Sequence, residues 1–149
     1  MTTNIKKGGC LCGNFKYEFD TSKVISTHHC HCTDCQKSTG SGKATIIMVP
    51  VEEIRKKGEL KFFIVKGTDG SHVNRGFCPN CGSPIISFVS EMSHINFIKA
   101  GSLDDSSWIE INSETLLEDL NNKFLNFSFC KKSSLIKSLP FLIIDGSLW

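Results

Sequence analysis

Hydrophobic and polar residues alternate along much of the first hundred residues, and this alternation predicts short β-strands. In the segment 14–19 the aromatic side chains Phe15, Tyr17 and Phe19 share one face of such a strand. Further β-prone runs, separated by Gly, Pro and Asn, occupy residues 24–29, 44–49, 60–65, 71–77, 85–89 and 95–100. Many short strands at this spacing predict a mainly β domain, built as an antiparallel sandwich or barrel.

Helical patterns are fewer and shorter. A helical turn is expected at residues 33–38, where the breaker Thr39-Gly40-Ser41-Gly42 ends it. A short helix is expected at 51–57, because Gly58 follows it and basic residues lie near its carboxyl end. Leucines at helical spacing predict a longer helix at 113–124, and an apolar run predicts a final strand at 139–144.

Composition and charge exclude several classes of protein. The chain has 149 residues, 40% of them hydrophobic, which suits one domain with a sizeable core. A formal net charge of +2 with scattered lysines gives no nucleic-acid footprint. The apolar runs are too short to span a bilayer, and the first residues lack the pattern of a signal peptide. We therefore expect a cytoplasmic protein with no membrane and no nucleic-acid partner.

Seven of the eight cysteines fall into three tight groups. In a reducing compartment such groups favour metal binding or catalysis over disulfides. Zinc is bound tetrahedrally by thiolates, and two ligands from one short turn can reach one ion. Iron–sulfur ligation is a weaker alternative. The groups are Cys10-Leu11-Cys12-Gly13, Cys30-His31-Cys32-Thr33-Asp34-Cys35 and Cys78-Pro79-Asn80-Cys81-Gly82.

The number of clustered cysteines predicts two different sites. A structural zinc takes four protein ligands, whereas a catalytic zinc keeps one position open. Two turns with two cysteines each can supply four ligands, which leaves three, although spacing alone does not say which turns combine. The eighth cysteine, Cys130, is interpreted as a small hydrophobic residue.

The cysteine motifs and their neighbours resemble the glutathione-dependent formaldehyde-activating enzyme family, which also includes proteins of the centromere protein V type. The resemblance covers roughly residues 1–105. It is carried by Gly9-Cys10-Leu11-Cys12-Gly13, Cys30-His31-Cys32-Thr33-Asp34-Cys35-Gln36-Lys37 with Ser41-Gly42, Arg75-Gly76-Phe77-Cys78-Pro79-Asn80-Cys81-Gly82 and Gly101-Ser102-Leu103-Asp104-Asp105.

The resemblance implies a β-tent of short antiparallel strands around a structural zinc. It implies two zinc ions per chain and a carbon–sulfur lyase-type activity, the reversible addition of glutathione to formaldehyde to give S-(hydroxymethyl)glutathione. By motif position, the structural ligands are Cys10, Cys12, Cys78 and Cys81, and the ligands of the catalytic zinc are Cys30, Cys32 and Cys35.

Substrate contacts are expected beside the cysteine motifs. Glutathione carries two carboxylates, so cations and backbone donors are the candidates: Lys37, Ser41, Gly42, Lys43 and Arg75. Histidines also lie near the second group. His31 is a possible proton carrier, although it can equally point away, and His28 or His29 would close the site if either became a fourth ligand.

We treat residues 1–149 as one domain, with a family-like core at 1–105 and a divergent segment at 106–149. The chain departs from many relatives at Lys43-Ala44, where an apolar or aromatic residue commonly follows the Ser-Gly pair. Two alternatives to an enzyme stay open: a zinc-stabilised protein-binding module that does not catalyse, and a thiol-rich metal-binding protein. The physiological substrate and the oligomeric state are not predicted.

Overall fold

The computed structural model describes residues 4–67 and 70–112 of the chain. These residues belong to one compact unit, Met1–Leu117. The helix predicted at 113–124, the strand predicted at 139–144 and Cys130 lie outside the described residues. The described part is mainly β, as the sequence predicted, and its strands form two antiparallel sheets.

The smaller sheet has the strand order β1-β2-β5. Strand β2 (Lys16–Asp20) lies in the centre, between β1 (Ile5–Gly9) and β5 (Ile54–Lys57). Its two aromatic side chains, Tyr17 and Phe19, and that of Phe15 just before it are almost fully buried, and the rings of Tyr17 and Phe19 stack with centroids 6.2 Å apart. The predicted alternation at 14–19 is therefore confirmed.

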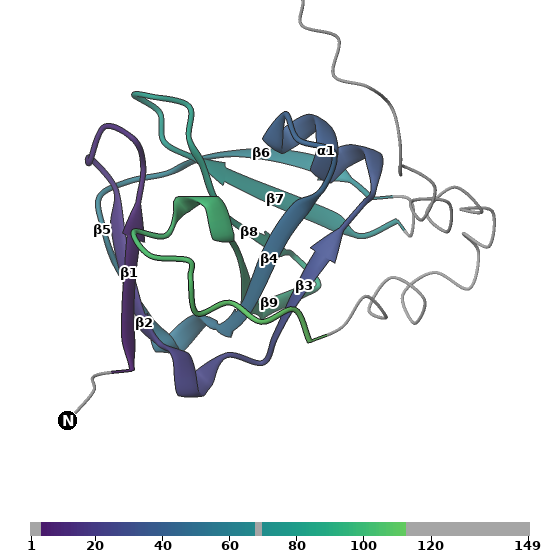
Figure 1. Ribbon diagram of the computed structural model, residues 1–149. Helices are drawn as coiled ribbons and strands as arrows, with labels where there is room; N and C mark the ends of the chain where they lie inside the picture. The colour runs from purple at the N-terminus through teal and green to yellow at the C-terminus, as the bar shows by residue number, and fades with distance from the viewer. Residues whose placement is uncertain (1–3, 68–69, 113–149) are drawn as a thin grey trace, which may run out of the picture. The chain divides into compact units, whose positions relative to one another are not determined.

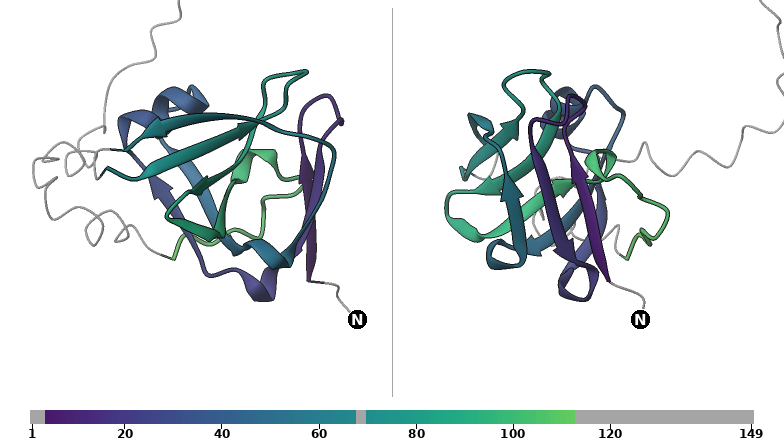
Figure 2. Two further views of the ribbon diagram at one scale, coloured as in Figure 1. Left: turned by 180° about the vertical axis from the view of Figure 1, so that it is seen from behind. Right: turned by 90° about the vertical axis from the view of Figure 1, so that its left-hand side faces the viewer.

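The larger sheet has six strands in the order β3-β4-β9-β8-β7-β6. In Figure 1 and in the rear view of Figure 2, β1 and β2 lie to one side of this sheet, and α1 lies at the other side. Its strands, in chain order, are β3 (Ser26–Cys30), β4 (Ala44–Pro50), β6 (Lys61–Lys66), β7 (His72–Phe77), β8 (Pro84–Val89) and β9 (Met92–Lys99).

The hydrophobic core joins the two sheets. Phe19 from the small sheet and Phe15, the residue before β2, pack in one cluster with Ile47, Ile85 and Ile98 from the large sheet. Each of these five side chains is at most 2% exposed. Burial of such a side chain is worth about 1.5–3 kcal/mol relative to exposure, so this cluster is the main force that holds the sheets together.

Among the described residues, helical structure is limited to short segments. The α-helix α1 (Thr33–Thr39) confirms the predicted turn, and it ends at Gly40, whose φ of 65° is left-handed. Three 3₁₀ turns are η1 (Thr21–Lys23), η2 (Val51–Glu53) and η3 (Ala100–Ser102). Within the described residues, no helix is long and apolar enough to cross a membrane.

The helix predicted at 51–57 is wrong. Only Val51–Glu53 forms a helical turn, and Ile54–Lys57 forms strand β5. In this strand Ile54 pairs with Phe19 of β2 and is buried. Pairing along β2 and burial of Ile54 outweigh the weak helical preference of the segment.

Strand β1 was not predicted. Its sequence, Ile5-Lys6-Lys7-Gly8-Gly9, carries little intrinsic β preference. Gly8 is nevertheless required at its position, because a Cβ there would collide with the ring of Tyr17 and the carbonyl oxygen of Ser102. Pairing with β2 decides this strand, and the close approach at Gly8 that the pairing requires is not revealed by the sequence pattern.

Candidate metal sites and the adjoining cleft

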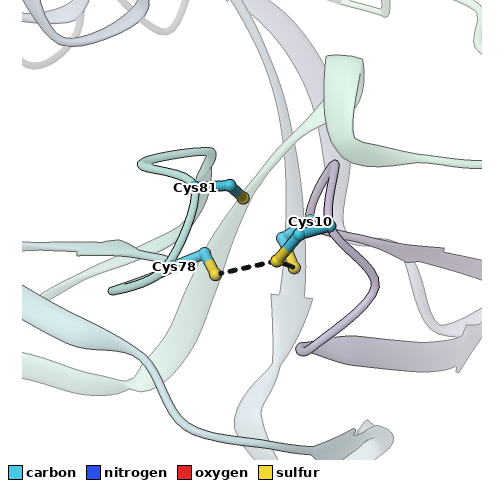
Figure 3. A group of neighbouring side chains, drawn as sticks. Cys10, Cys78 and Cys81 are labelled. Atoms are coloured by element: carbon cyan, nitrogen blue, oxygen red, sulfur yellow. Dashed lines mark hydrogen bonds between the residues drawn. The ribbon is translucent and has the colours of Figure 1, made fainter.

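Four cysteine sulfurs meet where two turns face each other. Cys10 and Cys12 belong to the turn after β1, and Cys78 and Cys81 belong to the turn after β7. All four sulfurs lie within 4.8 Å of one another. The Cys10 and Cys12 sulfurs are 3.5 Å apart, and those of Cys12 and Cys78 are 3.7 Å apart. Figure 3 shows the side chains of Cys10, Cys78 and Cys81 pointing toward one another.

The two turns share one backbone design. The N–H of Gly13 donates to the carbonyl of Cys10 at 3.0 Å, and the N–H of Gly82 donates to the carbonyl of Cys78 at 2.9 Å. Both glycines have left-handed φ angles, 78° and 74°, which a residue with a Cβ rarely adopts. Each glycine closes its turn so that both cysteines of the pair point to the same side.

Hydrogen bonds support the thiolate form of two members of this group, Cys10 and Cys81. The N–H of Phe15 donates to the Cys10 sulfur at 3.2 Å. The N–H of Leu11 donates to the hydroxyl oxygen of Ser83, which is 3.2 Å from the Cys81 sulfur. The Ser83 hydroxyl and backbone N–H groups lower the pKa of Cys81 to about 5. Ser83 was not predicted from the sequence; its place two residues after Cys81 is the signal for it.

The donor set of this group fits zinc. A tetrahedral ion about 2.3 Å from each thiolate sulfur places the sulfurs about 3.8 Å apart. The observed separations of 3.5 and 3.7 Å are close to that value. Cys78 is fully buried and Cys10 is 8% exposed, whereas Cys81 is half-buried and Cys12 is exposed, so an ion held here would be covered by protein on one side and near the surface on the other.

A second group of three sulfurs lies at the amino end of α1. Cys30 ends strand β3, Cys32 caps the helix, and Cys35 lies in its first turn. Their sulfurs lie within 4.8 Å of one another, and the Cys30 and Cys32 sulfurs are 3.4 Å apart. The same tetrahedral geometry therefore fits this group, with one ligand position not supplied by the three cysteines.

No described histidine joins the second group of sulfurs. The His28 side chain is buried, and burial lowers its pKa. His29 instead places its Nδ1 3.1 Å from the Thr45 hydroxyl, and its ring lies edge-on to that of His31, with centroids 6.4 Å apart. Within residues 4–67 and 70–112, the group has three ligands and no fourth.

Two cations lie near the second group. The Arg75 guanidinium is 3.2 Å from the Ser38 hydroxyl, 3.7 Å from the Asp34 carboxylate and 4.0 Å from the Cys35 sulfur. Lys99, on β9, is only 7% exposed. Hydrogen bonds from the neighbouring cysteines hold the pKa of the Cys35 thiol well below its usual value, and Lys99 and Arg75 add to this effect.

A cleft of about 930 Å³ lies next to this group: its lining includes Cys10 of the first group and residues that neighbour Cys30, but none of the three cysteines of the second group. Its walls come from the end of β1 with its turn, from the start of β4 and its preceding loop, and from the segment that follows β9. The lining includes His29, which precedes Cys30 in the chain, and Ala44, which pairs with Cys30 in the sheet. The cleft therefore reaches the strand that carries the first cysteine of the second group.

The structure separates the predicted substrate contacts into two sets. Ser41 and Lys43 line the cleft, whereas Lys37, Gly42 and Arg75 do not. Lys37 is exposed on α1. Arg75 contacts the helix through Ser38 and Asp34 instead.

Lys99 is a cleft residue that the sequence analysis missed. It was assigned to the apolar strand predicted at 95–100 and received no role. The signal for it is a single charge within the buried run Ile98-Lys99-Ala100. Charged side chains are rarely buried without a specific reason.

Comparisons with known proteins agree with this architecture. A model of the family described as "Glutathione-dependent formaldehyde-activating enzyme" matches residues 5–119. No curated protein sequence matches the chain significantly. Among solved structures, the chain is similar to the crystal structure of a Rhodobacter sphaeroides protein, with 19% identity and a TM-score of 0.52. That similarity covers 77% of this chain and 94% of the other, and it shows a shared fold. The family match spans both cysteine groups and the cleft, and the chain belongs to the glutathione-dependent formaldehyde-activating enzyme family.

Proposed function

We propose that the protein catalyses the reversible addition of glutathione, or a related thiol, to formaldehyde or another small aldehyde. The product with formaldehyde is S-(hydroxymethyl)glutathione. One observation carries the proposal: three cysteine sulfurs lie together without a fourth ligand among the described residues, and the adjoining cleft is large enough for a small peptide. Membership of the family supports this reading.

Two zinc ions per chain belong to the proposal. Cys10, Cys12, Cys78 and Cys81 would hold a structural ion, and Cys30, Cys32 and Cys35 would hold the second. A bound zinc ion would lower the pKa of a coordinating thiol, so that the thiol is deprotonated at neutral pH. Free thiols have a pKa near 8.5, so only a few per cent of glutathione is a nucleophile without such help.

The reaction itself forms one bond and moves one proton. The substrate thiolate sulfur attacks the carbonyl carbon of the aldehyde, and a carbon–sulfur bond forms. The carbonyl electron pair moves to oxygen, and this oxygen takes up one proton. The thiol lost one proton when it became a thiolate, so the overall reaction neither releases nor consumes protons. Exposed residues such as Ser41 and Lys43 line the cleft, so water can deliver that proton. The role of the chain is to orient the two reactants.

Exchange spectroscopy tests the proposal, because the addition also proceeds slowly without a catalyst. The rate of magnetisation transfer between glutathione and S-(hydroxymethyl)glutathione is measured by NMR with and without zinc-loaded protein. We expect faster exchange in proportion to protein concentration, and no acceleration with Cys32→Ser. Equal rates with wild type, Cys32→Ser and no protein would contradict the proposal.

A protein-binding module is the second candidate. Strand β6 lies at the edge of the larger sheet and exposes Phe62 (44%), Phe63 (64%) and Ile64 (59%). Edge strands with apolar side chains are suited to pairing with another chain. Under this function, loss of the second metal site would leave partner binding unchanged, whereas Phe63→Lys would abolish it. A cytoplasmic location, where thiols stay reduced, suits either function.

A further inference from the structure

Lys99 is a largely buried residue whose ammonium group has no direct partner among the residues that the structure describes. Its side chain lies on the last residue of β9, next to η3, and is 93% removed from solvent, since 7% of it is exposed. Within residues 4–67 and 70–112, its ammonium group makes no hydrogen bond and no ion pair with a carboxylate. Burial lowers its pKa, and the nearby cysteines oppose that effect. A charge in this position is costly unless an anion joins it.

The fold places Lys99 both in the wall of the cleft and near the second group of cysteines. It lines the cleft, and its charge interacts with the sulfurs of Cys30, Cys32 and Cys35. Its β4 partner in the sheet is Ile46, two residues beyond the Ala44 that pairs with Cys30. Lys99 therefore belongs both to the wall of the cleft and to the electrostatic surroundings of the three cysteines, where the proposed reaction would occur.

We propose that Lys99 binds a carboxylate of the thiol substrate in the cleft and so makes the enzyme selective for anionic thiols. This inference rests on the proposed function, because it names the class of thiol that the same site accepts. The substrate carboxylate provides the direct hydrogen-bond partner that Lys99 lacks among the described residues, and a neutral thiol provides none. Glutathione, with two carboxylates, belongs to the favoured class.

The nearby cations do not perform the same role. Arg75 is held by Asp34 and Ser38 and does not line the cleft. Lys43 lines the cleft but is exposed, so a carboxylate bound to it stays partly in water. A charge-assisted hydrogen bond is stronger where water is excluded, and this favours Lys99 as the residue that decides affinity.

The test measures binding without chemistry. S-methylglutathione has both carboxylates but no free thiol, so it cannot add to an aldehyde. Its dissociation constant for zinc-loaded, ¹⁵N-labelled protein is measured by NMR titration and compared with that of its dimethyl ester. We expect the ester to bind about 10- to 100-fold more weakly to wild type, which is the range for a hydrogen bond to a charged group. This comparison needs no variant to fold.

Variants then assign the difference to Lys99. In Lys99→Gln the acid should lose about 10- to 100-fold in affinity while the ester changes little, and Lys99→Arg should recover part of the loss. Lys61→Gln, which replaces an exposed lysine at the start of β6, is the matched control and should bind both ligands as wild type does.

Equal binding of the acid and the ester to wild type would overturn the inference. The inference would also be overturned if Lys99→Gln bound S-methylglutathione as tightly as wild type does. Lys99 would then interact with the cysteine thiolates but not with the ligand. The proposed function is judged separately by the exchange experiment. If the acid binds selectively through Lys99 but the protein does not accelerate exchange, the proposed enzymatic function is contradicted and the proposed carboxylate-binding site is retained.

Discussion

The backbone N–H of Cys35 donates a hydrogen bond to the sulfur of Cys32 at 3.3 Å, so a candidate metal ligand also caps the helix α1. The helix in turn places Cys35 beside the other two sulfurs. Local structure and the candidate site are therefore coupled through one side chain. An account of the site has to separate these two roles of Cys32.

Replacement of Cys32 by serine and by alanine separates them. Serine is a good helix cap, so Cys32→Ser should keep α1 and the unfolding free energy of the metal-free protein, while the zinc content of the untreated protein falls from two ions per chain to one. Cys32→Ala should lose the same ion and also about 1 kcal/mol of stability, because the cap is gone. Zinc analysis and urea unfolding of chelator-treated protein measure the two effects. Two zincs in Cys32→Ser would contradict the assignment.

Cys81→Ser should damage the fold itself. The group Cys10, Cys12, Cys78 and Cys81 joins the turn after β1 to the turn after β7, so loss of its ion removes a link between distant segments. We expect a fall in melting temperature of about 10 °C or more. Circular dichroism checks this. Cys130→Ser, which changes the cysteine outside all three motifs, is the control, and an equally stable Cys81→Ser protein would show that the group is not structural.

Arg75→Met should weaken metal binding at the second group alone. The guanidinium connects β7 to α1 through Ser38 and Asp34, and it lies 4.0 Å from the Cys35 sulfur. Supporting contacts of this kind are worth about 10-fold or more in metal affinity. Competition with a chromophoric chelator measures the two sites separately. Lys37→Met, on the exposed face of α1, should leave both affinities unchanged, and an equal loss in the two variants would show that Arg75 has no specific role.

Gly58→Ala should destabilise the protein for steric and conformational reasons together. Gly58 follows β5 with a φ of 100°, and a Cβ there would collide with the carbonyl oxygen of Asn14. We expect a loss of about 2–3 kcal/mol. Gly70→Ala is the matched control, because Gly70 has a similar φ of 88° but open space around it. Its cost should be about 1 kcal/mol. Urea unfolding that gives equal costs would remove the steric part of the argument.

Asp105→Asn should change the dependence of stability on pH. The Lys6 ammonium is 2.8 Å from the Asp105 carboxylate and, with Ser107, holds the pKa of that carboxyl well below its usual value. A lowered carboxyl pKa stabilises the fold above the unfolded-state pKa of about 4, and this contribution disappears as pH falls toward the folded-state pKa. The difference in unfolding free energy between wild type and variant should therefore be largest at neutral pH and shrink below about pH 4.

Urea unfolding of both proteins at a series of pH values measures that difference. Acid also releases bound metal, but it does so in both proteins, so the difference between them isolates the carboxylate. A gap that stays constant from neutral pH to the most acidic point would contradict this prediction.

Much of the fold was predictable because short-range patterns specify it. The alternation of Phe15, Tyr17 and Phe19 predicted β2, and the Thr33–Thr39 helix followed from the breaker after it. The two exceptions have one cause. Strand β1 and the β5 half of the segment 51–57 take their form from pairing with β2, and no local pattern records that pairing.

The sequence by itself determined which cysteines form motifs suited to metal binding, because the spacing of two ligands within one short turn is a local feature. The expected ligand sets came from the resemblance to a family. Only the tertiary structure brings the turn at Cys10 to the turn at Cys78, across more than sixty residues of chain. Only the tertiary structure buries Lys99 beside the cleft, because the packing of β9 between β4 and β8 decides which side chains lose contact with water. The spacing of ligands along the chain determines what one turn can bind. The surroundings of a charged side chain, in contrast, depend on strands that are distant in sequence.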